Sequence, residues 1–580
     1  MSRVLGQFWR LLKLCIAGEG GKFGLVLYAI VLGLELSQIL VSLRMIEWSK
    51  SFYDALQQVD GPTALTQVGV FFIIVFIGVG LTLLSSFTRQ HLQIRWRRSL
   101  TNAAMTRWLA NRSFLKLERE RTGGLDNPDQ RIAEDCRFFL AGPMGEHGGG
   151  IGLIPLSLDL ITNVVAIFSY VAVLWSIASF ALPLGFMGIE GEIPRYMVWA
   201  AFIYVALSTG LTHFLGRPLK RLYAEQQRRE ADFRFGLIRV RENAEPIAMA
   251  AGEAAERRDL DRRFGGIVIN WKKLINRELI LMSFTYPYRS TVLRIPTFLA
   301  LPAFFAGSVT FGGLMQLASA FSSVTTTLSW FIFSYRPLAD LVAAASRLDS
   351  FLNATEGSSA RPGIVERPSP DGSLGLSGLE LFAPDDRRLL DLDQLSLRQG
   401  ESVWLSGPSG LGKTTLLKTV AGIWPHATGR IETPAGVTSF LPQDAYLPVG
   451  GVLESVAYPR VPADFSVAER EAALRAVGLG HLIAPDDGET QKGLSGGEQQ
   501  RLALARLLLH KPDYAFLDEA TSALDLAAER QLLNLLRERL PGTAFLVVAH
   551  REPTGLGPLR KVELRAARTA SSPSLETVPA

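Results

Sequence analysis

The segment from Val68 to Leu84 contains no charged residue, and this run restricts the possible fold more than any other part of the chain. A helix needs about 20 apolar residues to cross the hydrocarbon core of a bilayer. The surrounding stretch 67–87 reaches that length, and so do 24–43, 151–177 and 196–215. Two weaker stretches, 279–307 and 312–335, contain prolines and arginines or many Ser and Thr residues. The pattern predicts a membrane α-helical bundle with six transmembrane spans within residues 1–350.

The positions of the basic residues predict the orientation of these spans. Arg and Lys follow the second and fourth stretches, within 89–98 and 217–229, whereas the loops after the first, third and fifth are short and poor in both. Cytoplasmic loops of membrane proteins carry an excess of Lys and Arg. We therefore expect a cytoplasmic N-terminus, and six crossings would return the C-terminal part to the cytoplasm as well.

The composition fits a membrane protein. Hydrophobic residues make up 48% of the chain and the mean hydropathy is +0.19. The formal net charge is +5, which is compatible with a nucleic-acid-binding surface or with basic cytoplasmic loops. Because the basic residues follow the apolar stretches, the second interpretation is favoured. We expect a lipid bilayer as a partner and no nucleic acid.

The sequence between and after the apolar stretches predicts how the rest of the chain is organised. The segments 88–150 and 217–278 are charged and helix-prone, so the membrane helices are expected to continue into the cytoplasm. Gly, Pro and Ser predict a linker at 351–373. The aperiodic residues 566–580 predict a disordered tail. A second domain is expected between them, over 374–565.

A phosphate-binding pattern lies near the start of this second domain. Residues 407–414 match G-x-x-x-x-G-K-[ST] and stand between an expected strand at 402–405 and an expected helix at 415–421. In that context the loop N–H groups and the helix N-terminus face anionic oxygens. Lys413 is expected to reach the β- and γ-phosphates, and Thr414 to ligate Mg²⁺. The expected ATP contacts here are Gly407, Pro408, Ser409, Gly410, Leu411, Gly412, Lys413, Thr414 and Thr415.

Polar side chains follow three further apolar strands. Asp518 and Glu519 end the first, and we expect Asp518 to hold Mg²⁺ and Glu519 to activate the attacking water. Gln443 follows the second strand and His550 the third. The carboxyl ends of parallel strands surround the ligand crevice in α/β sheets. Gln443 is therefore expected to contact Mg²⁺ or the water, and His550 the γ-phosphate.

In this order, the motifs of 374–565 resemble the nucleotide-binding domain of ABC transporters. The loop 407–414 is similar to the Walker A motif, Gln443 to the Q-loop, 494–498 to the signature motif, and 516–519 to the Walker B strand. His550 is similar to the switch histidine, and the segment 522–525 to the D-loop. The resemblance implies an α/β P-loop domain that binds ATP and Mg²⁺. It also implies four further ATP-site residues: Ser495, Gly496, Gly497 and Asp525.

The resemblance implies a dimer as well. In the family, the signature serine and glycines close on the γ-phosphate that is held by the Walker A loop of a second domain. This chain has one motif of each kind, so it is half of such an assembly. A homodimer is the simplest completion, and a heterodimer with a similar chain is the alternative.

Short motifs outside the ATP site resemble a narrower group. The segments 127–132, 245–253, 421–425 and 441–448 are similar to subfamily D half-transporters and their bacterial relatives. The segment 48–56 resembles the bacterial branch linked to uptake of vitamin B12, bleomycin and antimicrobial peptides. These resemblances imply an exporter-type fold in a bacterial inner membrane, with import as an open possibility.

The function that the sequence predicts is ATP-driven transport of a hydrophilic or amphipathic solute, of the cobalamin or peptide kind. Export of a lipid-like or acyl-CoA-like solute is one alternative, and an ATP-gated channel or regulator is another. A soluble ABC ATPase acting on ribosomes or DNA is a third alternative, and the uncharged run 68–84 disfavours it. The residues do not identify the solute or its direction.

Two residues keep two interpretations each. Glu35 is an acid inside the first span, where ionisable groups usually face a wet cavity or pair with another charge. It is either a cavity-lining acid that meets the solute or the structural partner of a residue such as Arg294. Phe382 is either the aromatic residue that stacks on adenine or a residue of a core strand.

Overall fold

The computed structural model of the chain describes residues 2–119, 127–142, 152–183, 192–291, 294–356, 363–448, 450–483 and 494–564. It forms two compact units, Met1–Ser359 and Ala360–Ala580. The first five residues of the expected linker 351–373 are helical, because Phe351 and Leu352 are buried against the helices of the first unit. The expected tail 566–580 lies outside the described residues.

The first unit is built from helices. Asp60 accepts a hydrogen bond from the Thr63 N–H at 3.2 Å and Pro62 occupies the first turn, so a cap and a proline together start the longest helix. The main helices are α1 (Ser2–Ala17), α2 (Gly21–Gln57), α3 (Gly61–Leu109), α7 (Leu153–Ile177), α8 (Tyr196–Glu242), α10 (Glu253–Thr291), α11 (Ile295–Phe305), α12 (Phe311–Phe333) and α13 (Tyr335–Thr355).

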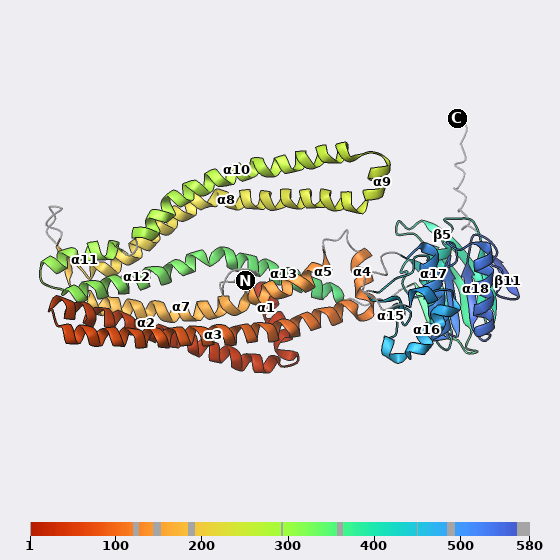
Figure 1. Ribbon diagram of the computed structural model, residues 1–580, viewed down its shortest axis with the longest axis horizontal. Coiled ribbons are helices and arrows are strands. Elements are labelled where there is room, and N and C mark those ends of the chain that lie inside the picture. Colours follow the sequence, from red (N-terminus) through yellow and green to blue (C-terminus); the bar gives the residue numbers. More distant parts are fainter. Residues whose placement is uncertain are drawn as a thin grey trace, which may run out of the picture. The chain divides into compact units, whose positions relative to one another are not determined.

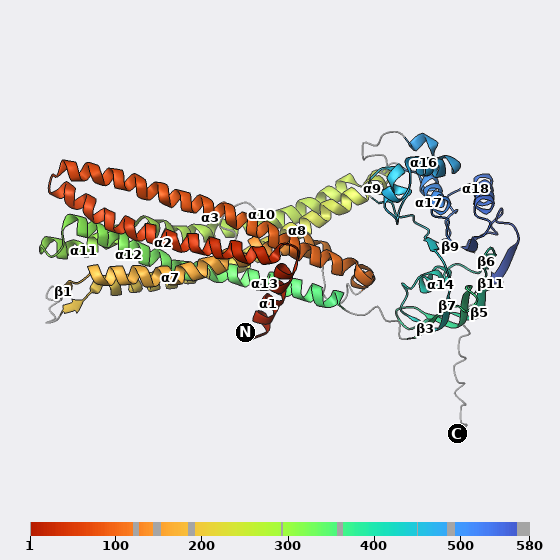
Figure 2. The same cartoon turned by 90° about the horizontal axis from the view of Figure 1, so that it is seen from below.

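Short elements complete the first unit. They are the 3-10 turn Ala110–Arg112, α4 (Ser113–Arg119), α5 (Pro128–Gln130), the π-helical turn Arg131–Asp135, α6 (Cys136–Ala141), β1 (Ala181–Pro183), β2 (Glu192–Pro194) and α9 (Ala244–Met249). Strands β1 and β2 pair antiparallel. Figures 1 and 2 show α2 and α3 side by side, and Figure 1 shows α9 joining the far ends of the paired helices α8 and α10.

Among the described residues, four helical segments are long and apolar enough to cross a membrane: Gly21–Gln57, Gly61–Glu118, Leu153–Ile177 and Tyr196–Glu242. The second and fourth of these helices extend well beyond the apolar stretches 67–87 and 196–215. The charged, helix-prone sequence that follows each stretch indicated such an extension. The expected fifth span falls within two described helices: α10 reaches Thr291, residues 292–293 lie outside the described residues, and α11 has Pro296 in its first turn. The count of six crossings therefore stays a prediction.

Close helix packing in the first unit depends on small residues. A Cβ atom added to Gly24 of α2 would lie 2.1 Å from Nε1 of Trp96 on α3, so only glycine fits there. The same indole donates a hydrogen bond to the Gly21 carbonyl at 3.1 Å. Apolar residues of α1, α3, α6 and α13 gather in one buried cluster, and those of α2, α7, α8 and α12 in another. Small residues at such contacts are characteristic of helix pairs in membranes.

The second unit contains two sheets. A five-stranded parallel sheet has the order β11-β6-β10-β9-β8, from β6 (Ser402–Ser406), β8 (Thr438–Leu441), β9 (Tyr514–Asp518), β10 (Ala544–Val548) and β11 (Leu559–Glu563). A four-stranded mixed sheet has the order β3-β7-β4-β5, from β3 (Ile364–Pro368), β4 (Leu374–Phe382), β5 (Arg388–Leu397) and β7 (Ala427–Thr433).

The helices of the second unit are α14 (Lys413–Val420), α15 (Val452–Ser455), α16 (Val467–Ala476), α17 (Gly496–His510) and α18 (Leu526–Arg539), with single 3-10 turns at Pro462–Asp464 and Gly480–Leu482. Strands β9 and β10 are buried at every residue, which is typical of parallel strands covered on both faces.

The register of the parallel sheet decides where its polar residues meet. Val548 lies opposite both Asp518 and Leu405, and Leu441 lies opposite Leu517. The carboxyl ends of β6, β8, β9 and β10 are therefore level. Every loop that follows these strands leaves from the same edge of the sheet, which we call the carboxyl edge.

Candidate functional site

The phosphate loop leaves the carboxyl edge after β6. Gly410 and Gly412 have φ values of +79° and +95°, in the left-handed region that glycine adopts without strain. Gly412 is also the N-cap of α14, so the loop turns directly into the helix. The Lys413 ammonium donates to the carbonyls of Gly407 and Pro408 at 2.7 and 2.9 Å, which fixes it inside the curve of the loop. A helix N-terminus behind such a loop favours anions.

Thr414 and Asp518 meet at the carboxyl edge. The Thr414 hydroxyl donates to Asp518 Oδ1 at 3.0 Å, and Asp518 is 6% exposed. Burial raises the pKa of Asp518, and the hydrogen bond from Thr414 acts in the opposite direction. Two hard oxygen ligands that converge in this way suit Mg²⁺, which usually combines one or two protein ligands with substrate phosphates. Among the described residues, no group of three or more His, Cys, Asp or Glu side chains is arranged to hold a metal ion.

Glu519 and His550 form the next pair. Glu519 follows β9 with a φ of +50°, which is unusual for a residue other than glycine, and its N–H donates to the Val548 carbonyl at 2.9 Å. Its Oε1 lies 2.9 Å from Nε2 of His550, which follows β10 by two residues. The glutamate side chain is 16% exposed and the imidazole is 58% exposed. The pair therefore places a sheltered carboxylate beside an accessible ring.

Gln443 and Phe382 lie at the margins of this arrangement. Gln443 is exposed, two residues beyond the end of β8, and β8 pairs with β9. It therefore leaves the same edge of the sheet as Asp518. Phe382 ends β4 and is half-buried, and its carbonyl accepts a hydrogen bond from the Trp424 indole at 3.0 Å. Phe382 thus lies in a strand, and its stacking on adenine stays a prediction.

The signature segment starts α17. Ser495 is its N-cap, and a capping box joins the Ser495 hydroxyl to the Glu498 N–H while Glu498 Oε2 accepts from the Ser495 N–H at 2.8 Å. These hydrogen bonds lower the pKa of Glu498. Ser495 and Gly496 are exposed. The first turn of α17 is thus a well-formed helix start at the surface of the unit.

The D-loop residue Asp525 is a cap of the same kind. Its side chain accepts from the Ala528 N–H at 2.9 Å and starts α18. The structure therefore brings Lys413, Thr414, Asp518, Glu519 and His550 together at the carboxyl edge. Ser495, Gly496, Gly497 and Asp525 lie instead at the starts of α17 and α18.

The sequence patterns of two families match the chain. The pattern described as "ABC transporter transmembrane region 2" matches residues 11–305, and the pattern described as "ABC transporter" matches residues 390–522. The first covers more than half of the chain, and the two follow each other in the order of the two units. The chain belongs to the ABC transporter family.

Curated relatives agree over nearly the whole length of this ABC transporter. It is 33% identical to the inner membrane ABC transporter ATP-binding protein YddA of Escherichia coli (strain K12) over 561 residues, which are 95% of this chain and 96% of the relative. It is 28% identical to the human lysosomal cobalamin transporter ABCD4 over 542 residues, which are 86% and 84% of the two chains. It is 26% identical to ABC transporter D family member 2, chloroplastic, of Arabidopsis thaliana, over 90% of this chain and 81% of the relative.

Family membership confirms the larger predictions. The ABC transporter has a membrane helical region followed by an ABC ATPase domain, and it binds ATP and couples its hydrolysis to transport. Its relatives include subfamily D and bacterial half-transporters, so dimerisation and membrane association are properties of its group.

Sequence reasoning missed a polar hub of the ABC transporter at Gln500. This side chain is 6% exposed and lies in the second turn of α17. Its amide group donates to the Glu519 carbonyl at 3.4 Å and to the Ser522 hydroxyl at 3.1 Å, and it accepts from the Ala523 N–H at 2.9 Å. Gln500 thus ties the signature helix to the residue that follows β9. Its place inside an otherwise apolar helix face was the available signal.

A second missed group surrounds Glu529, which is 2% exposed in the first turn of α18. It accepts from Thr521 at 2.7 Å and forms an ion pair with Arg551 at 3.0 Å. Arg551 also donates to the Leu524 carbonyl at 3.4 Å. The residue after His550 is thereby fixed to the D-loop.

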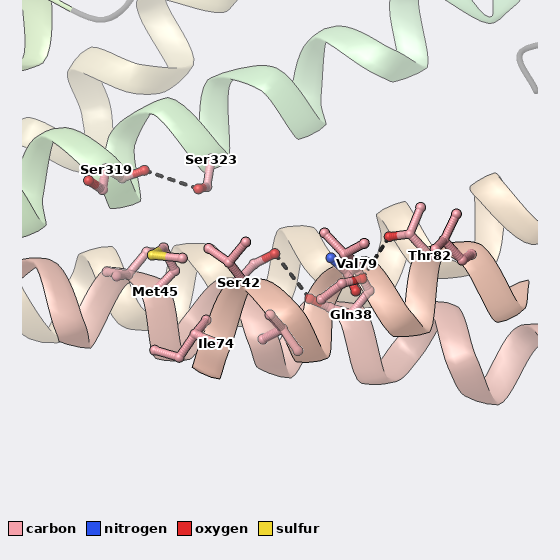
Figure 3. A pocket seen from close by; sticks show the side chains of 13 residues that line it. Gln38, Ser42, Met45, Ile74, Val79, Thr82, Ser319 and Ser323 are labelled. Atoms are coloured by element: carbon pink, nitrogen blue, oxygen red, sulfur yellow. Dashed lines mark hydrogen bonds between the residues drawn. The ribbon is translucent and has the colours of Figure 1, made fainter. Parts of the chain in front are cut away.

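The first unit, Met1–Ser359, which we call the membrane unit, has two neighbouring cavities among its described residues. One, of about 480 Å³, is lined mainly by apolar side chains of α2 and α3 and by Ser319 and Ser323 of α12. Figure 3 shows these serines on one side, facing Gln38, Ser42 and Met45 of α2. The other, of about 300 Å³, is lined by polar residues of α2, α7 and α12, including Glu35 and Asp159.

The position of Glu35 corrects its expected structural partner. Its Oε1 lies 3.7 Å from Nη1 of Arg89 on α3 and accepts a hydrogen bond from Ser85 at 3.3 Å. Arg294, the expected partner, precedes α11 instead. Residues 35 and 89 pair because α2 and α3 lie side by side, whereas the expected pairing assumed contact with the fifth span. The cavity-lining interpretation of Glu35 agrees with the lining of the smaller cavity.

Proposed function

We propose that two copies of the chain form a homodimer in the bacterial inner membrane and move a hydrophilic or amphipathic solute across it by alternating access. The N-terminus and the second unit, Ala360–Ala580, which we call the ATPase unit, lie in the cytoplasm. Six spans per chain cross the bilayer. ATP binding draws two ATPase units together, and hydrolysis lets them separate. The differential affinity of ATP for the closed state supplies the conformational change.

The observation that carries the proposal is the separation of two half-sites in one ATPase unit. The hydrogen bonds of the α17 start go to its own capping box and to His481, and Gln500 binds the segment after β9. Ser495 and Gly496 remain exposed, and so do Ser409 and Gly410 of the phosphate loop. Exposed N–H groups at a helix N-terminus favour an anion. A second copy offers that anion as the γ-phosphate on its own phosphate loop.

The residues at the carboxyl edge divide the chemistry between them. Lys413 and the loop 407–412 hold the phosphates, and Thr414 and Asp518 hold Mg²⁺, with Gln443 as a further ligand in the closed state. When bound, Mg²⁺ neutralises charge on the phosphate oxygens. Glu519 accepts a proton from the attacking water, and its contact with His550 at 2.9 Å orients it toward the γ-phosphate. Asp525 holds the D-loop at the contact with the partner.

The class of solute rests on the polar cavity and on one relative. Glu35, Asp159, Thr162, Asn163 and Thr327 line the smaller cavity, and these groups suit a hydrated solute. The human relative is named as a lysosomal cobalamin transporter. The apolar lining of the larger cavity favours a second candidate, export of a lipid-like or acyl-CoA-like solute.

Complementation between two inactive variants tests the homodimer and its composite sites. Lys413→Ala disables the phosphate loop and Ser495→Arg blocks the start of α17, so either homodimer lacks an intact site. A mixed dimer has one intact site, made from the loop of one chain and the α17 start of the other. We expect ATP hydrolysis by co-expressed, differently tagged chains to exceed that of either variant alone. Tandem-purified mixed dimers that hydrolyse no more ATP than the two parents would contradict the composite site.

Flux measurements test transport itself. Inside-out vesicles and proteoliposomes with the full chain are given Mg-ATP and a panel of cobalamin, peptides and acyl-CoA. Accumulation against a gradient, absent in Glu519→Gln, is the expected result. ATP hydrolysis without uphill accumulation of any of these solutes would favour a gated channel or regulator.

A further inference from the structure

The smaller membrane cavity has an unbalanced set of charges. Glu35 of α2 and Asp159 of α7 both line it. Arg89 of α3 acts electrostatically on both carboxylates, and its guanidinium approaches Glu35 Oε1 to 3.7 Å. In the described part of the chain, no basic side chain forms an ion pair with Asp159, whereas Glu35 has Arg89 nearby. The two carboxyl groups thus have a single guanidinium near them among the described residues.

An unpaired acceptor lies at the junction with the larger cavity. Gln38 and Ser42 line both cavities, so the two spaces adjoin at these residues. The Gln38 Oε1 atom is buried and finds no donor among the described residues. A buried acceptor without a donor is unfavourable and usually indicates a missing partner. The carboxylates and this amide oxygen both require a group that is positively charged or carries N–H donors.

The larger cavity supplies a different environment next to these groups. This cavity has a volume of about 480 Å³. Its wall includes the apolar side chains of Ile46, Ile74, Val75, Val79 and Leu83. Apolar groups of a solute gain free energy by leaving water for such a wall. Figure 3 shows Met45 and Ile74 on the same side of this cavity as Gln38 and Ser42.

We propose that the two cavities bind one amphipathic solute, with its cationic nitrogen between Glu35 and Asp159 and its apolar part against α2 and α3. This inference rests on the proposed transport function and adds the chemical class of the solute. An ammonium donates hydrogen bonds to the carboxylates and supplies a positive charge to the acid that has no basic partner. An anionic group would meet two carboxylates instead, so carboxylates and phosphates are disfavoured at this position.

The test compares two probes that differ by one charge. Dansylcadaverine joins a primary amine to an aromatic ring, and its N-acetyl derivative keeps the ring without the charge. Binding of each to the full chain in lipid nanodiscs is measured by energy transfer from tryptophan to the dansyl group, without nucleotide. We expect the amine to bind about tenfold more tightly than the acetylated probe, since hydrogen bonds to charged groups have at least that effect. Equal affinities, or no binding of either probe, would overturn the proposal.

Charge variants test the assignment with opposite signs. Asp159→Asn and Glu35→Gln should each reduce the preference for the amine to near unity and leave the acetylated probe unaffected. Arg89→Gln should increase the preference severalfold, because it removes the competing cation. The matched control is Glu47→Gln, which removes an exposed acid of the same helix that pairs with Arg44 at 2.6 Å outside the cavities. Its preference should equal that of the wild type.

These measurements separate the site from transport. A purely structural role for the acids would give no increase in Arg89→Gln, and a preference retained in Asp159→Asn and Glu35→Gln would remove both from the site. If an acid variant fails to fold, the two-probe comparison on the wild type and the Arg89→Gln result still decide. A clear amine preference without any ATP-driven flux would leave the site in place and reject the transport proposal.

Discussion

The ATPase unit positions its charged groups with strands, and the membrane unit positions them with the faces of long helices. In the first, Thr414, Asp518, Glu519 and His550 follow three neighbouring strands and contact one another within 3.0 Å. In the second, Glu35 and Asp159 lie inside helices, and the Arg89 guanidinium is 3.7 Å from Glu35. The strand edge brings polar side chains into close pairs, whereas among the described residues the helix faces leave Asp159 without an ion-pair partner.

The difference separates two tasks. Chemistry on phosphate is shared by the whole family and requires fixed distances, which a sheet register provides. Recognition of a solute requires a cavity with a few polar groups that are free to bind it, which packed helices provide. Each substitution below tests whether one unit depends on the feature that this comparison assigns to it.

The largest effect is expected from Glu519→Gln in the ATPase unit. Loss of the general base should lower the ATP hydrolysis rate about 100-fold or more, while ATP binding remains. Phosphate release and filter binding of labelled ATP measure the two quantities on the full chain. Turnover near the wild-type rate would show that the sheltered carboxylate is not the base, and the comparison would lose its central pair.

Lys413→Ala is expected to weaken ATP binding about tenfold to 100-fold, because a charge-assisted contact to phosphate is lost. Its ammonium is bonded to two loop carbonyls, so the loop should also become more mobile. The exposed Lys418 of the same helix provides the control, and Lys418→Ala should bind ATP normally. Unchanged affinity in Lys413→Ala would contradict its role at the phosphates.

Gly24→Ala tests the close packing of the membrane unit. The added methyl group would overlap Trp96, and overpacking of this kind costs about 1–3 kcal/mol. Cys15 and Cys136 are fully buried in the cluster that contains Trp96, so their maleimide labelling during heating reports its opening. Labelling should begin at a lower temperature in Gly24→Ala. Gly80→Ala is the control, because no atom lies within 4 Å of its added Cβ.

Gln500→Ala sharpens the comparison within the ATPase unit. Removal of the hub should lower kcat about tenfold with little change in KM for ATP, because Glu519 and the loop 522–523 lose their shared hydrogen bonds. The neighbouring Gln499→Ala removes only a bond to the Leu494 carbonyl and should have a smaller effect. A proportional rise in KM without a change in kcat would place Gln500 in nucleotide binding instead.

The smallest effect is expected in the pH dependence of Mg²⁺ activation. Burial raises the pKa of Asp518, and a protonated carboxyl does not ligate the metal. As the pH falls from 7 to about 5, the Mg²⁺ concentration for half-maximal hydrolysis should therefore rise earlier than an ordinary aspartate would allow. Binding of ATP without Mg²⁺ should not follow this curve. A flat response would indicate that Asp518 stays ionised despite its burial.

The sequence predicted the ATPase unit better than the membrane unit, for a physical reason. The phosphate loop is contiguous, and Asp518 and His550 each follow an apolar run whose carboxyl end had to reach a common edge. Gln500 was missed because its partners lie about twenty residues away and become neighbours only when α17 packs on the segment after β9.

In the membrane unit, helix existence was predictable and helix rotation was not. The acid at position 35 was identified as functional or paired, but its partner depended on which face of α2 meets α3. Asp159 and Gln38 join Glu35 at one cavity only because α2 and α7 present those turns to each other. In the expected fifth span, Pro296 lies in the first turn of α11, where a proline ring fits better than in a helix interior.

The tie between Gln500 and Glu519 has a consequence for timing in an assembled pair. Each chain would bind one nucleotide through its own phosphate loop and contact the neighbouring nucleotide through the start of α17. The Gln500 side chain on α17 donates to the backbone carbonyl of Glu519. A displacement of α17 at the neighbouring nucleotide would therefore be transmitted to Glu519 beside the chain's own nucleotide. ATP hydrolysis at the two sites would then be coordinated by the rigid contact within each chain, with no need for a signal through the bilayer.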